Sequence, residues 1–441
     1  MGRPGASHIG NLLDRRWLAA IVLATLAPAA ARAQSPQAAN VEETLTLKDS
    51  LDRAYANNPK LLSASKELEI AKTHLSQARS LFYPKVDLNL DYVKFRNERL
   101  GLPPRGLGDL ILSPSGDGLR TQSLYYGRLG FQQTLYAGGK LNYTYKLSQA
   151  NVKRSESGFE RLRREVEFET AKGFYGLVAL QEKERAVEAS LKEVSRLSAG
   201  SASLEVAAVK ADLRKRFSEL VEAENQTRFD YLQTMGVELF RKVALKGSLE
   251  PPSVSLDLET DLSWAKENRN EIKETEIQEE VDQLYISLSQ SENHPVFLLG
   301  GGVEVQNNKF PLDETNWDTV LSMNIPVFNG FSTFSRIRER QFQAEQTRLK
   351  RVELEDQVER DVRSGIREYQ HWQDEVKTRQ QEIDFLEKTW RQNGSSALKE
   401  RLNFMQWDLN ERLSLIEAKY EMCLASAGLS KALGRSLEDQ P

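Results

Sequence analysis

The sequence contains two copies of one unit, and this repeat limits the possible folds more than any other feature. The copies align at three places: residues 54–61 with 265–272, Pro84 with Pro295, and Gly139 with Gly330. The first two alignments have an offset of 211 and the third an offset of 191. Such regular self-similarity is the signature of a duplicated structural unit. We therefore expect a first repeat at 34–245, a linker at 246–256, a second repeat at 257–434 and a C-terminal tail at 435–441.

Each copy has the same order of predicted elements. A helical segment ends at a proline, which cannot continue the interior of a helix. Alternating apolar and polar residues follow and predict a β-hairpin. A proline-free stretch then predicts a long helical hairpin with a glycine at its tip. The predicted segments are helices at about 46–82 and 257–293, β-hairpins at about 85–136 and 296–328, and helical hairpins with tips near Gly200 and Gly394.

The first helix of each helical hairpin is unusually long. Residues 140–197 and 331–391 contain no proline and little glycine. At ~1.5 Å per residue, each would extend about 90 Å, which exceeds an ordinary globular domain. Apolar residues recur at spacings of three and four, as at Val358, Val362 and Ile366. This spacing favours coiled-coil packing, with the charged remainder facing water.

The N-terminus predicts export. Arg15 and Arg16 precede an apolar stretch, and Ala31-Arg32-Ala33 supplies a cleavage site, so residues 1–33 have the features of a secretory signal peptide. An uncleaved anchor is the alternative. The formal net charge of −4 argues against nucleic acid as the main partner, because phosphate binding requires a basic face. Beyond the signal there is no apolar run of about 20 residues, which argues against a membrane bundle of helices.

The chemistry-bearing residues predict neither a cofactor nor an enzyme. The chain has four histidines and one cysteine, without the spacing of a metal site, and one cysteine allows no internal disulfide. The motifs of metalloproteases, serine hydrolases, P-loop proteins and dinucleotide-binding proteins are absent or incomplete. We therefore expect no catalytic residue, no bound cofactor and no metal.

Four amphipathic strands cannot close a membrane barrel, because the smallest such barrels need about eight. An open sheet edge in lipid would leave backbone groups unpaired at several kcal/mol each. If these strands cross a membrane, several chains must share one barrel; two chains or three satisfy this condition. A soluble sandwich with one buried face is the alternative. In a shared barrel the polar positions would line a wet lumen, and the candidates are Asp87, Asn89, Asp91, Glu304 and Asn324.

Five segments, in order along the chain, resemble one family. They are 47–51 (LKDSL), 76–84 (SQARSLFYP), 132–140 (QQTLYAGGK), 325–330 (IPVFNG) and 431–434 (KALG). Each is weak alone, but together they resemble the TolC family of outer membrane channels over nearly the whole exported chain. The resemblance implies an α+β membrane protein: a homotrimer with a 12-stranded transmembrane β-barrel, four strands from each chain, continued by a long α-helical coiled-coil barrel.

The same resemblance implies a function and partners. The protein would be the outer membrane exit duct of a tripartite efflux pump or a type I secretion system, extending into the periplasm. It would conduct substrates passively. A periplasmic adaptor would meet the helical tips, and an inner-membrane transporter of the resistance-nodulation-division or ATP-binding cassette type would supply energy. The cargo is left open by the sequence, since a duct contacts its substrates loosely.

Site residues also follow from the resemblance. In this family a tip glycine is followed six and nine residues later by acidic residues that ring the closed aperture. After Gly394 these positions are Glu400 and Asn403, so the second position departs from the acidic pattern on which cation block depends. The nearest acidic residue after Gly200 is Glu205, which comes one place early. The gate candidates are Glu400, Asn403 and Glu205, and the expected adaptor contacts are Gly200, Ser201, Gly394 and Ser395.

One function of a different class remains open at this stage. A non-porous periplasmic structural protein, similar to an adaptor, would also have long coiled-coil hairpins. Such a protein would need no lipid-facing apolar band on both β-hairpins. The two hypotheses therefore differ most clearly in the strands.

Overall fold

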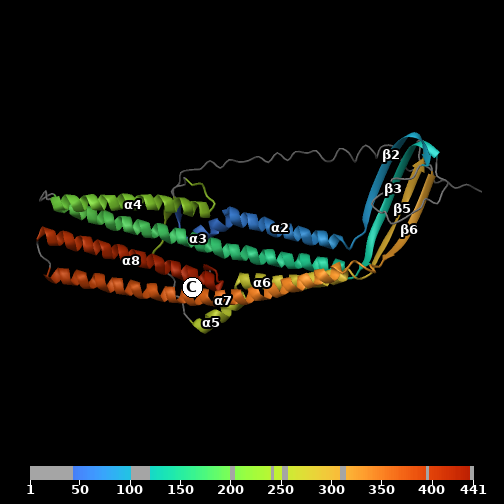
Figure 1. Ribbon diagram of the computed structural model, residues 1–441. Coiled ribbons are helices and arrows are strands. Elements are labelled where there is room, and N and C mark those ends of the chain that lie inside the picture. The colour runs from blue at the N-terminus through green and yellow to red at the C-terminus, as the bar shows by residue number, and fades with distance from the viewer. Residues whose placement is uncertain are drawn as a thin grey trace, which may run out of the picture. The chain divides into compact units, whose positions relative to one another are not determined.

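The computed structural model describes residues 43–100, 120–198, 204–239, 243–250, 257–307, 314–393 and 397–437. The predicted signal peptide at 1–33 lies outside these ranges. Most of the described chain is helical, and its strands form two sheets (Figure 1). None of the described helices combines the length and the apolar character needed to cross a membrane.

The first elements of the two halves have equal lengths and equal spacing. Helices α1 (Leu47–Asn57) and α5 (Leu258–Asn268) each contain 11 residues. Helices α2 (Pro59–Ser80) and α6 (Asn270–Ser291) each contain 22 residues. All four helices, and the first residues of the strands that follow α2 and α6 (Lys85 and Val296), keep the offset of 211 seen in the sequence. The repeat is therefore present in the arrangement of the elements as well as in the sequence.

Each predicted helix of this pair is interrupted by one extended residue. At the first junction Asn58 adopts φ −60° and ψ 120°, because the ring of Pro59 disfavours a helical residue before it. The Asn58 side chain then caps α2 by accepting hydrogen bonds from the backbone N–H groups of Lys60 and Leu61. At the equivalent junction Arg269 is extended in the same way. The expectation of one continuous helix at 46–82 and another at 257–293 was therefore wrong.

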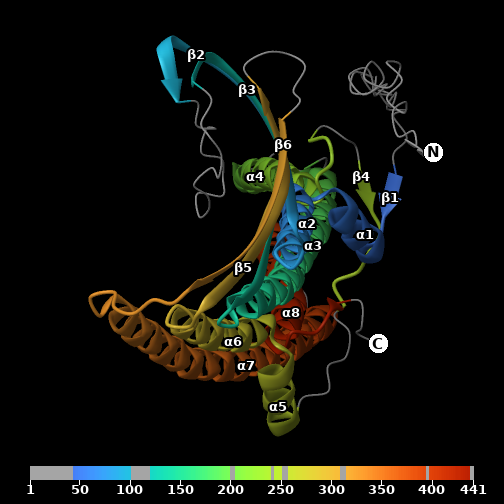
Figure 2. The same ribbon diagram turned by 90° about the vertical axis from the view of Figure 1, so that its right-hand side faces the viewer.

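Four strands form one antiparallel sheet (Figure 2). Its order is β2 (Lys85–Leu100), β3 (Arg120–Ala137), β5 (Val296–Asn307) and β6 (Glu314–Asn324), so the two hairpins join through β3 and β5. Strand β6 ends four residues before the predicted end at 328, and Pro326 beyond it cannot donate to a ladder. A separate parallel pair joins β1 (Glu43–Leu45) to β4 (Val243–Leu245). The sequence patterns do not predict this pair.

Four helices follow the strands. They are α3 (Lys140–Ser198), α4 (Leu204–Thr234), α7 (Ser332–Asn393) and α8 (Leu398–Leu433), and α3 and α7 contain 59 and 62 residues. Helix α3 contacts α2 and α4 on one side and α6 and α8 on the other, while α7 contacts α6 and α8. The helical layer therefore has its outer edges at α2, α4 and α7, and the sheet has its outer edges at β2 and β6.

Left-handed backbone connects each hairpin to its long helix. Gly138 and Gly139 have φ of 61° and 86°, and Gly330 and Phe331 have φ of 65° and 63°. A left-handed conformation is unstrained for glycine and costly for a residue with a Cβ. Helices α3 and α7 begin at an offset of 192, so Gly138 is the structural equivalent of Gly330. The sequence alignment that placed Gly139 on Gly330 was off by one residue.

Buried apolar side chains form separate clusters along the helices rather than one core. One cluster joins α1, α3 and α4 around Phe174, Tyr231 and Leu232. A second joins α3, α4 and α8 around Val187, Leu213 and Leu409. A third joins α5, α6, α7 and α8, and a fourth joins α3 and α6. Such a succession is what helices with an apolar seam produce when they pack along their whole lengths.

Candidate functional site

The sheet has one polar face and one apolar face. Side chains alternate between faces along each strand, and the strand register therefore assigns every residue to a face. Asp87, Gly130, Gly302 and Asp318 form one row across the four strands, and Asn89, Arg128, Glu304 and Asn316 form the next. The five residues predicted from sequence to line a lumen all lie on this face: Asp87, Asn89, Asp91, Glu304 and Asn324.

A hydrogen-bonded network crosses the polar face. The guanidinium of Arg128 donates to Glu304 Oε2 at 3.1 Å and pairs with Asp318 Oδ1 at 2.7 Å. Glu304 also accepts hydrogen bonds from Tyr126 Oη at 3.1 Å and from Asn316 Nδ2 at 3.3 Å. Charge-assisted bonds of this kind are stronger than neutral ones and fix geometry. One guanidinium thus connects strands β3, β5 and β6.

Glycines leave room for this arrangement. A Cβ at Gly302 would lie 2.7 Å from the carbonyl oxygen of Leu129 and 3.3 Å from Arg128 Nε. A Cβ at Gly130, the neighbour of Gly302 across the ladder, would lie 3.5 Å from the same nitrogen. Any larger side chain at Gly302 would therefore displace either backbone or guanidinium. The glycines let Arg128 lie against the sheet between its two carboxylates.

The opposite face exposes large apolar side chains. Leu88 and Leu90 on β2 are 65% and 73% exposed, and Trp317 on β6 is 74% exposed. The other exposed apolar residues of this face include Val86, Tyr92, Leu129, Phe131, Val303, Leu321 and Met323. Monomeric soluble proteins rarely expose a continuous apolar surface of this size. None of the described residues covers this face.

The gate candidates lie at the ends of two helices. Glu400 is in the first turn of α8, Asn403 follows on the same helix, and Glu205 is in the first turn of α4; all three side chains are exposed. By contrast, the residues six and nine positions after Gly200 are Val206 and Val209, and both are buried among α3, α4 and α8. The predicted adaptor contacts, Gly200, Ser201, Gly394 and Ser395, lie outside the described residues.

Two contacts lie near these ends, one within the second helical hairpin and one between the two hairpins. Trp390 on α7 stacks on Phe404 of α8 with ring centroids 4.3 Å apart and an interplanar angle of 7°. Arg401 of α8 lies 3.9 Å from Glu193 of α3, so the second hairpin touches the first. The contact between Arg401 and Glu193 is long and exposed, which makes it weak. It is the kind of contact that two helical hairpins can exchange when they slide past each other.

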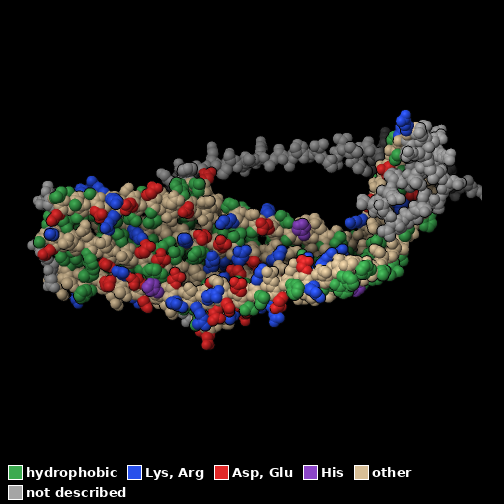
Figure 3. Space-filling model, in the orientation of Figure 1, with side chains coloured by type: hydrophobic (Ala, Val, Ile, Leu, Met, Phe, Trp, Pro, Cys, Tyr) green, Lys and Arg blue, Asp and Glu red, His purple; other side chains and the backbone are tan. Residues whose placement is uncertain are grey.

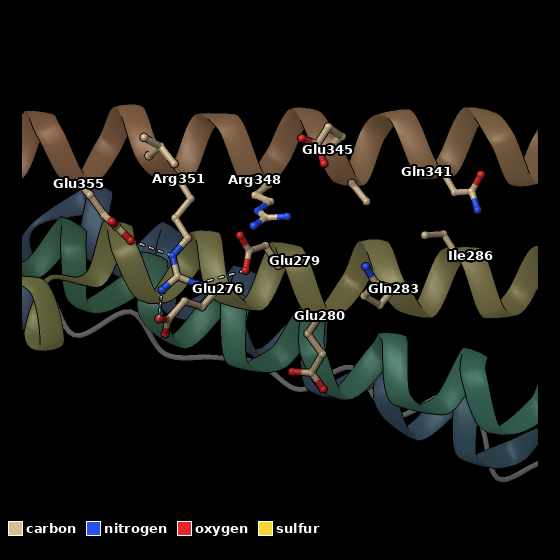
Figure 4. A pocket seen from close by; sticks show the side chains of 12 residues that line it. Glu276, Glu279, Glu280, Gln283, Ile286, Gln341, Glu345, Arg348, Arg351 and Glu355 are labelled. Atoms are coloured by element: carbon tan, nitrogen blue, oxygen red, sulfur yellow. Dashed lines mark hydrogen bonds and ion pairs between the residues drawn. The ribbon is translucent and has the colours of Figure 1, made fainter.

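A groove of about 800 Å³ runs between α6 and α7 (Figure 4). Its charged lining is mostly acidic, and Arg351 pairs with Glu276 at 3.0 Å, Glu279 at 3.1 Å and Glu355 at 3.0 Å. Figure 4 shows these three carboxylates converging on the guanidinium from both helices. The ion pairs of Arg351 therefore connect α6 and α7 across the groove. Among the described residues no group of three or more potential ligands is arranged to hold a metal.

The lone cysteine is unsuited to chemistry. Cys423 is buried in α8, and burial raises the pKa of its thiol to about 12, with Glu182 adding to the effect. A thiol needs its thiolate form to react or to bind a metal. The thiol therefore packs as a small apolar side chain.

Sequence reasoning missed most of the network on the polar face. It identified Glu304 but not Arg128, Tyr126, Asn316 or Asp318. The signal was present in part, because Arg128 is a charged residue at an alternate position of a predicted strand. The pairing of β3 with β5 decides which side chains meet, however, and that pairing joins residues from different repeats. No feature of one hairpin alone specifies it.

Comparison with known proteins relates part of the chain to one family. Residues 50–227 match the model of the family described as outer membrane efflux protein. No curated protein matches the chain by sequence. The match to the family model lies in the first repeat, which contains the motifs at 76–84 and 132–140.

Solved structures share the fold over most of the chain. The CmeC outer membrane channel of Campylobacter jejuni has 15% identity and a TM-score of 0.71, over 89% of this chain and 87% of that one. The outer membrane protein VceC of Vibrio cholerae has 15% identity and a TM-score of 0.69, over 88% and 96%. The open MtrE outer membrane channel of Neisseria gonorrhoeae has 14% identity and a TM-score of 0.71, over 89% of each chain.

The family resemblance inferred from the repeated motifs is thereby confirmed. The sequence match covers residues from α1 to α4, and the shared fold extends through both repeats. Residues 50–227 thus match the outer membrane efflux protein family, and both repeats share the fold of solved TolC-like outer membrane channels.

Proposed function

We propose that this chain forms the outer membrane exit duct of a tripartite efflux pump or a type I secretion system. It acts as a channel rather than as an enzyme and conducts substrates passively from the periplasm to the exterior. The observation that supports this most strongly is the four-stranded sheet, which is polar on one face and apolar on the other. Neither of its outer strands pairs with a further strand of the described chain.

The unpaired edges of β2 and β6 explain why several chains would associate. In lipid the unpaired backbone groups of β2 and β6 would cost several kcal/mol each, so each edge must meet another strand. The four strands have 16, 18, 12 and 11 residues, and about 9–11 residues suffice for a tilted strand to span a bilayer. Three copies that pair β2 with β6 of the next chain would make a closed 12-stranded barrel, with the polar face toward its lumen.

The helices support the same assembly. Helix α7 forms one outer edge of the helical layer and exposes Phe334, Phe342, Leu349 and Val352 along its first half. Green side chains gather where α7 starts, near the sheet, while charges of both signs are mixed over the rest of the visible surface (Figure 3). The other edge exposes Leu62 and Ile70 on α2. Packing α7 of one chain on α2 and α4 of the next would bury both apolar edges and close a helical tunnel.

The gate would lie at the far ends of the long helices. There Glu400 of three chains would form a ring of like charges, which attracts cations and resists anions. Opening would follow a sliding movement of the two helical hairpins relative to each other. A periplasmic adaptor would bind the helical tips around Gly200, Ser201, Gly394 and Ser395, and an inner-membrane transporter of the resistance-nodulation-division or ATP-binding cassette type would supply the energy.

Single-channel recording tests the duct. The mature protein is extracted in detergent, checked for a heat-sensitive oligomer on gels, and added to planar bilayers. We expect discrete conductance steps, and Glu400→Ala should change conductance or cation block. Unchanged behaviour of Glu400→Ala would remove that residue from the gate. A protein that remains soluble without detergent and passes no current would instead be a non-porous periplasmic coiled-coil protein.

A further inference from the structure

In its middle rows the polar face of the sheet carries more negative than positive charge among the described side chains, and Lys85 lies in the next row toward the helices. In the three rows that begin at Asp87, Asn89 and Asp91, the described side chains include the carboxylates of Asp87, Asp91, Glu304 and Asp318. In the described side chains of the same rows, Arg128 is the one cation. Fields from such a belt add up inside a narrow water-filled bore with low-dielectric walls. A lumen lined by this face would therefore concentrate cations.

Arg128 holds a fixed position within this belt. Its guanidinium is bound to Glu304 and Asp318 at 3.1 Å and 2.7 Å, and its side chain is only 25% exposed. The Glu304 and Asp318 side chains are 18% and 13% exposed. Because Gly302 provides the space, the guanidinium lies beside the sheet rather than extending into the bore. The cation thus neutralises its neighbours without obstructing passage.

We propose that Arg128 sets the charge selectivity of the strand-lined bore by offsetting part of a carboxylate belt that favours cations. This inference rests on the proposed duct function and names a determinant at the sheet, separate from the gate at the helical tips. Arg128 is a specificity-determining residue in this sense. Removal of its charge leaves Glu304 and Asp318 uncompensated, so the bore becomes more selective for cations.

Three features separate this role from a purely structural one. The effect depends on charge, so Arg128→Lys should preserve the selectivity of the wild type. It depends on the balance of charges, so the double variant Arg128→Gln with Asp318→Asn should also keep the selectivity of the wild type. It depends on the face of the sheet, and Lys94 supplies the matched control because it lies on the opposite face of β2.

The experiment measures reversal potentials in planar bilayers under a gradient of potassium chloride. We expect Arg128→Gln to raise the permeability ratio of potassium to chloride by about two-fold or more. Glu304→Gln and Asp318→Asn should each lower it, and Lys94→Gln should leave it unchanged. The differences should shrink near 1 M salt, where the Debye length is about 3 Å.

The outcomes distinguish this inference from the duct itself. If the wild type passes no current, the proposed function fails. If it conducts but Arg128→Gln has the selectivity of the wild type, or Lys94→Gln raises the ratio equally, the role of Arg128 is overturned while the duct stands. If Arg128→Gln does not assemble, Glu304→Gln and Asp318→Asn decide: a lowered ratio supports the charged belt, and an unchanged ratio overturns it.

Discussion

Gly236 ends helix α4 with a left-handed backbone of φ 66°. Its N–H donates to the carbonyl of Gln233, and the N–H of Val237 donates to that of Leu232, which is the usual way to satisfy the last carbonyls of a helix. A Cβ at this position would lie 2.2 Å from the carbonyl oxygen of Asn57. The close approach places the end of α4 against the junction of α1 and α2, where Asn58 Nδ2 donates to the carbonyl of Thr234.

Gly236→Ala therefore strains the backbone and separates two elements. We expect a loss of roughly 2 kcal/mol in the free energy of unfolding, from the left-handed conformation and the overlap together. The measurement is the urea midpoint of the detergent-solubilised protein by circular dichroism. Gly330→Ala is a useful control, because it has a similar φ of 65° but open space around its Cβ, and it should cost less.

The junction of α5 and α6 contains a partly buried ion-pair network. Arg269 Nη2 lies 3.1 Å from Glu271 Oε1, and its Nη1 lies 2.7 Å from Asp361 Oδ2 on α7. Burial acts to raise the pKa of Glu271, but the hydrogen bonds and charge of Arg269 outweigh it and lower that pKa below its ordinary value of 4.5. A lowered pKa means that the unfolded chain binds the proton more readily than the folded one. The contribution to stability is therefore complete above about pH 4.5 and is lost as the pH falls through the folded pKa.

Glu271→Gln should reveal this dependence. At pH 7 we expect the variant to lose about 1–2 kcal/mol, since Arg269 keeps one carboxylate and loses another. Near pH 3 the difference between variant and wild type should shrink. Thermal unfolding at both values checks the prediction. An equal difference at pH 7 and pH 3 would assign the effect to packing instead of charge.

At the scale of elements, the two faces of the sheet make different demands on substitution. Leu88 lies on the apolar face and its neighbour Asn89 on the polar face of the same strand. A charge on the lipid face of a membrane strand costs about 2–4 kcal/mol near the middle of the bilayer. A charge in a water-filled lumen has no such cost. The same substitution should therefore impair assembly at one residue of β2 and leave it intact at the next.

Leu88→Arg should reduce the amount of oligomer assembled in the outer membrane, while Asn89→Arg should leave assembly intact. The measurement is the yield of heat-sensitive oligomer from membranes for the two variants. Equal yields would argue that β2 does not face lipid, and would favour the soluble sandwich considered from the sequence.

Helix α7 gives a second prediction at this scale. Phe342 is 69% exposed in the chain and lies on the edge of the helical layer. Phe342→Asp should weaken association between copies, because it places a charge where an apolar side chain would be buried. Lys350→Asp, on the same helix and also exposed, serves as the control. The fraction of dissociated chain in mild detergent, followed by light scattering, should rise for Phe342→Asp alone.

Comparison of the predicted and observed elements shows which parts of the fold could be predicted from the sequence. Helices α3 and α7 were predicted within two residues, because a long proline-free apolar seam has few alternatives. The break at Arg269 was missed, since no proline follows it and only the equivalence with Asn58 indicates it. The pairing of β3 with β5 and of β1 with β4 was missed as well. Both join residues distant in sequence, and local patterns contain no information on such contacts.

At the scale of the whole molecule, both layers of the described part of the chain have open edges. The sheet ends at β2 and β6, and the helical layer ends at α2, α4 and α7. Both layers run in the same order, so one rotation about a common axis would close both at once. Closed symmetry of this kind is the usual solution for identical subunits.

Native mass spectrometry of the protein extracted from the outer membrane in detergent tests this closure most directly. The account predicts a particle with the mass of three mature chains. A particle of one chain, stable in water without detergent, would contradict it, because the edges of β2 and β6 would then have no partner strand.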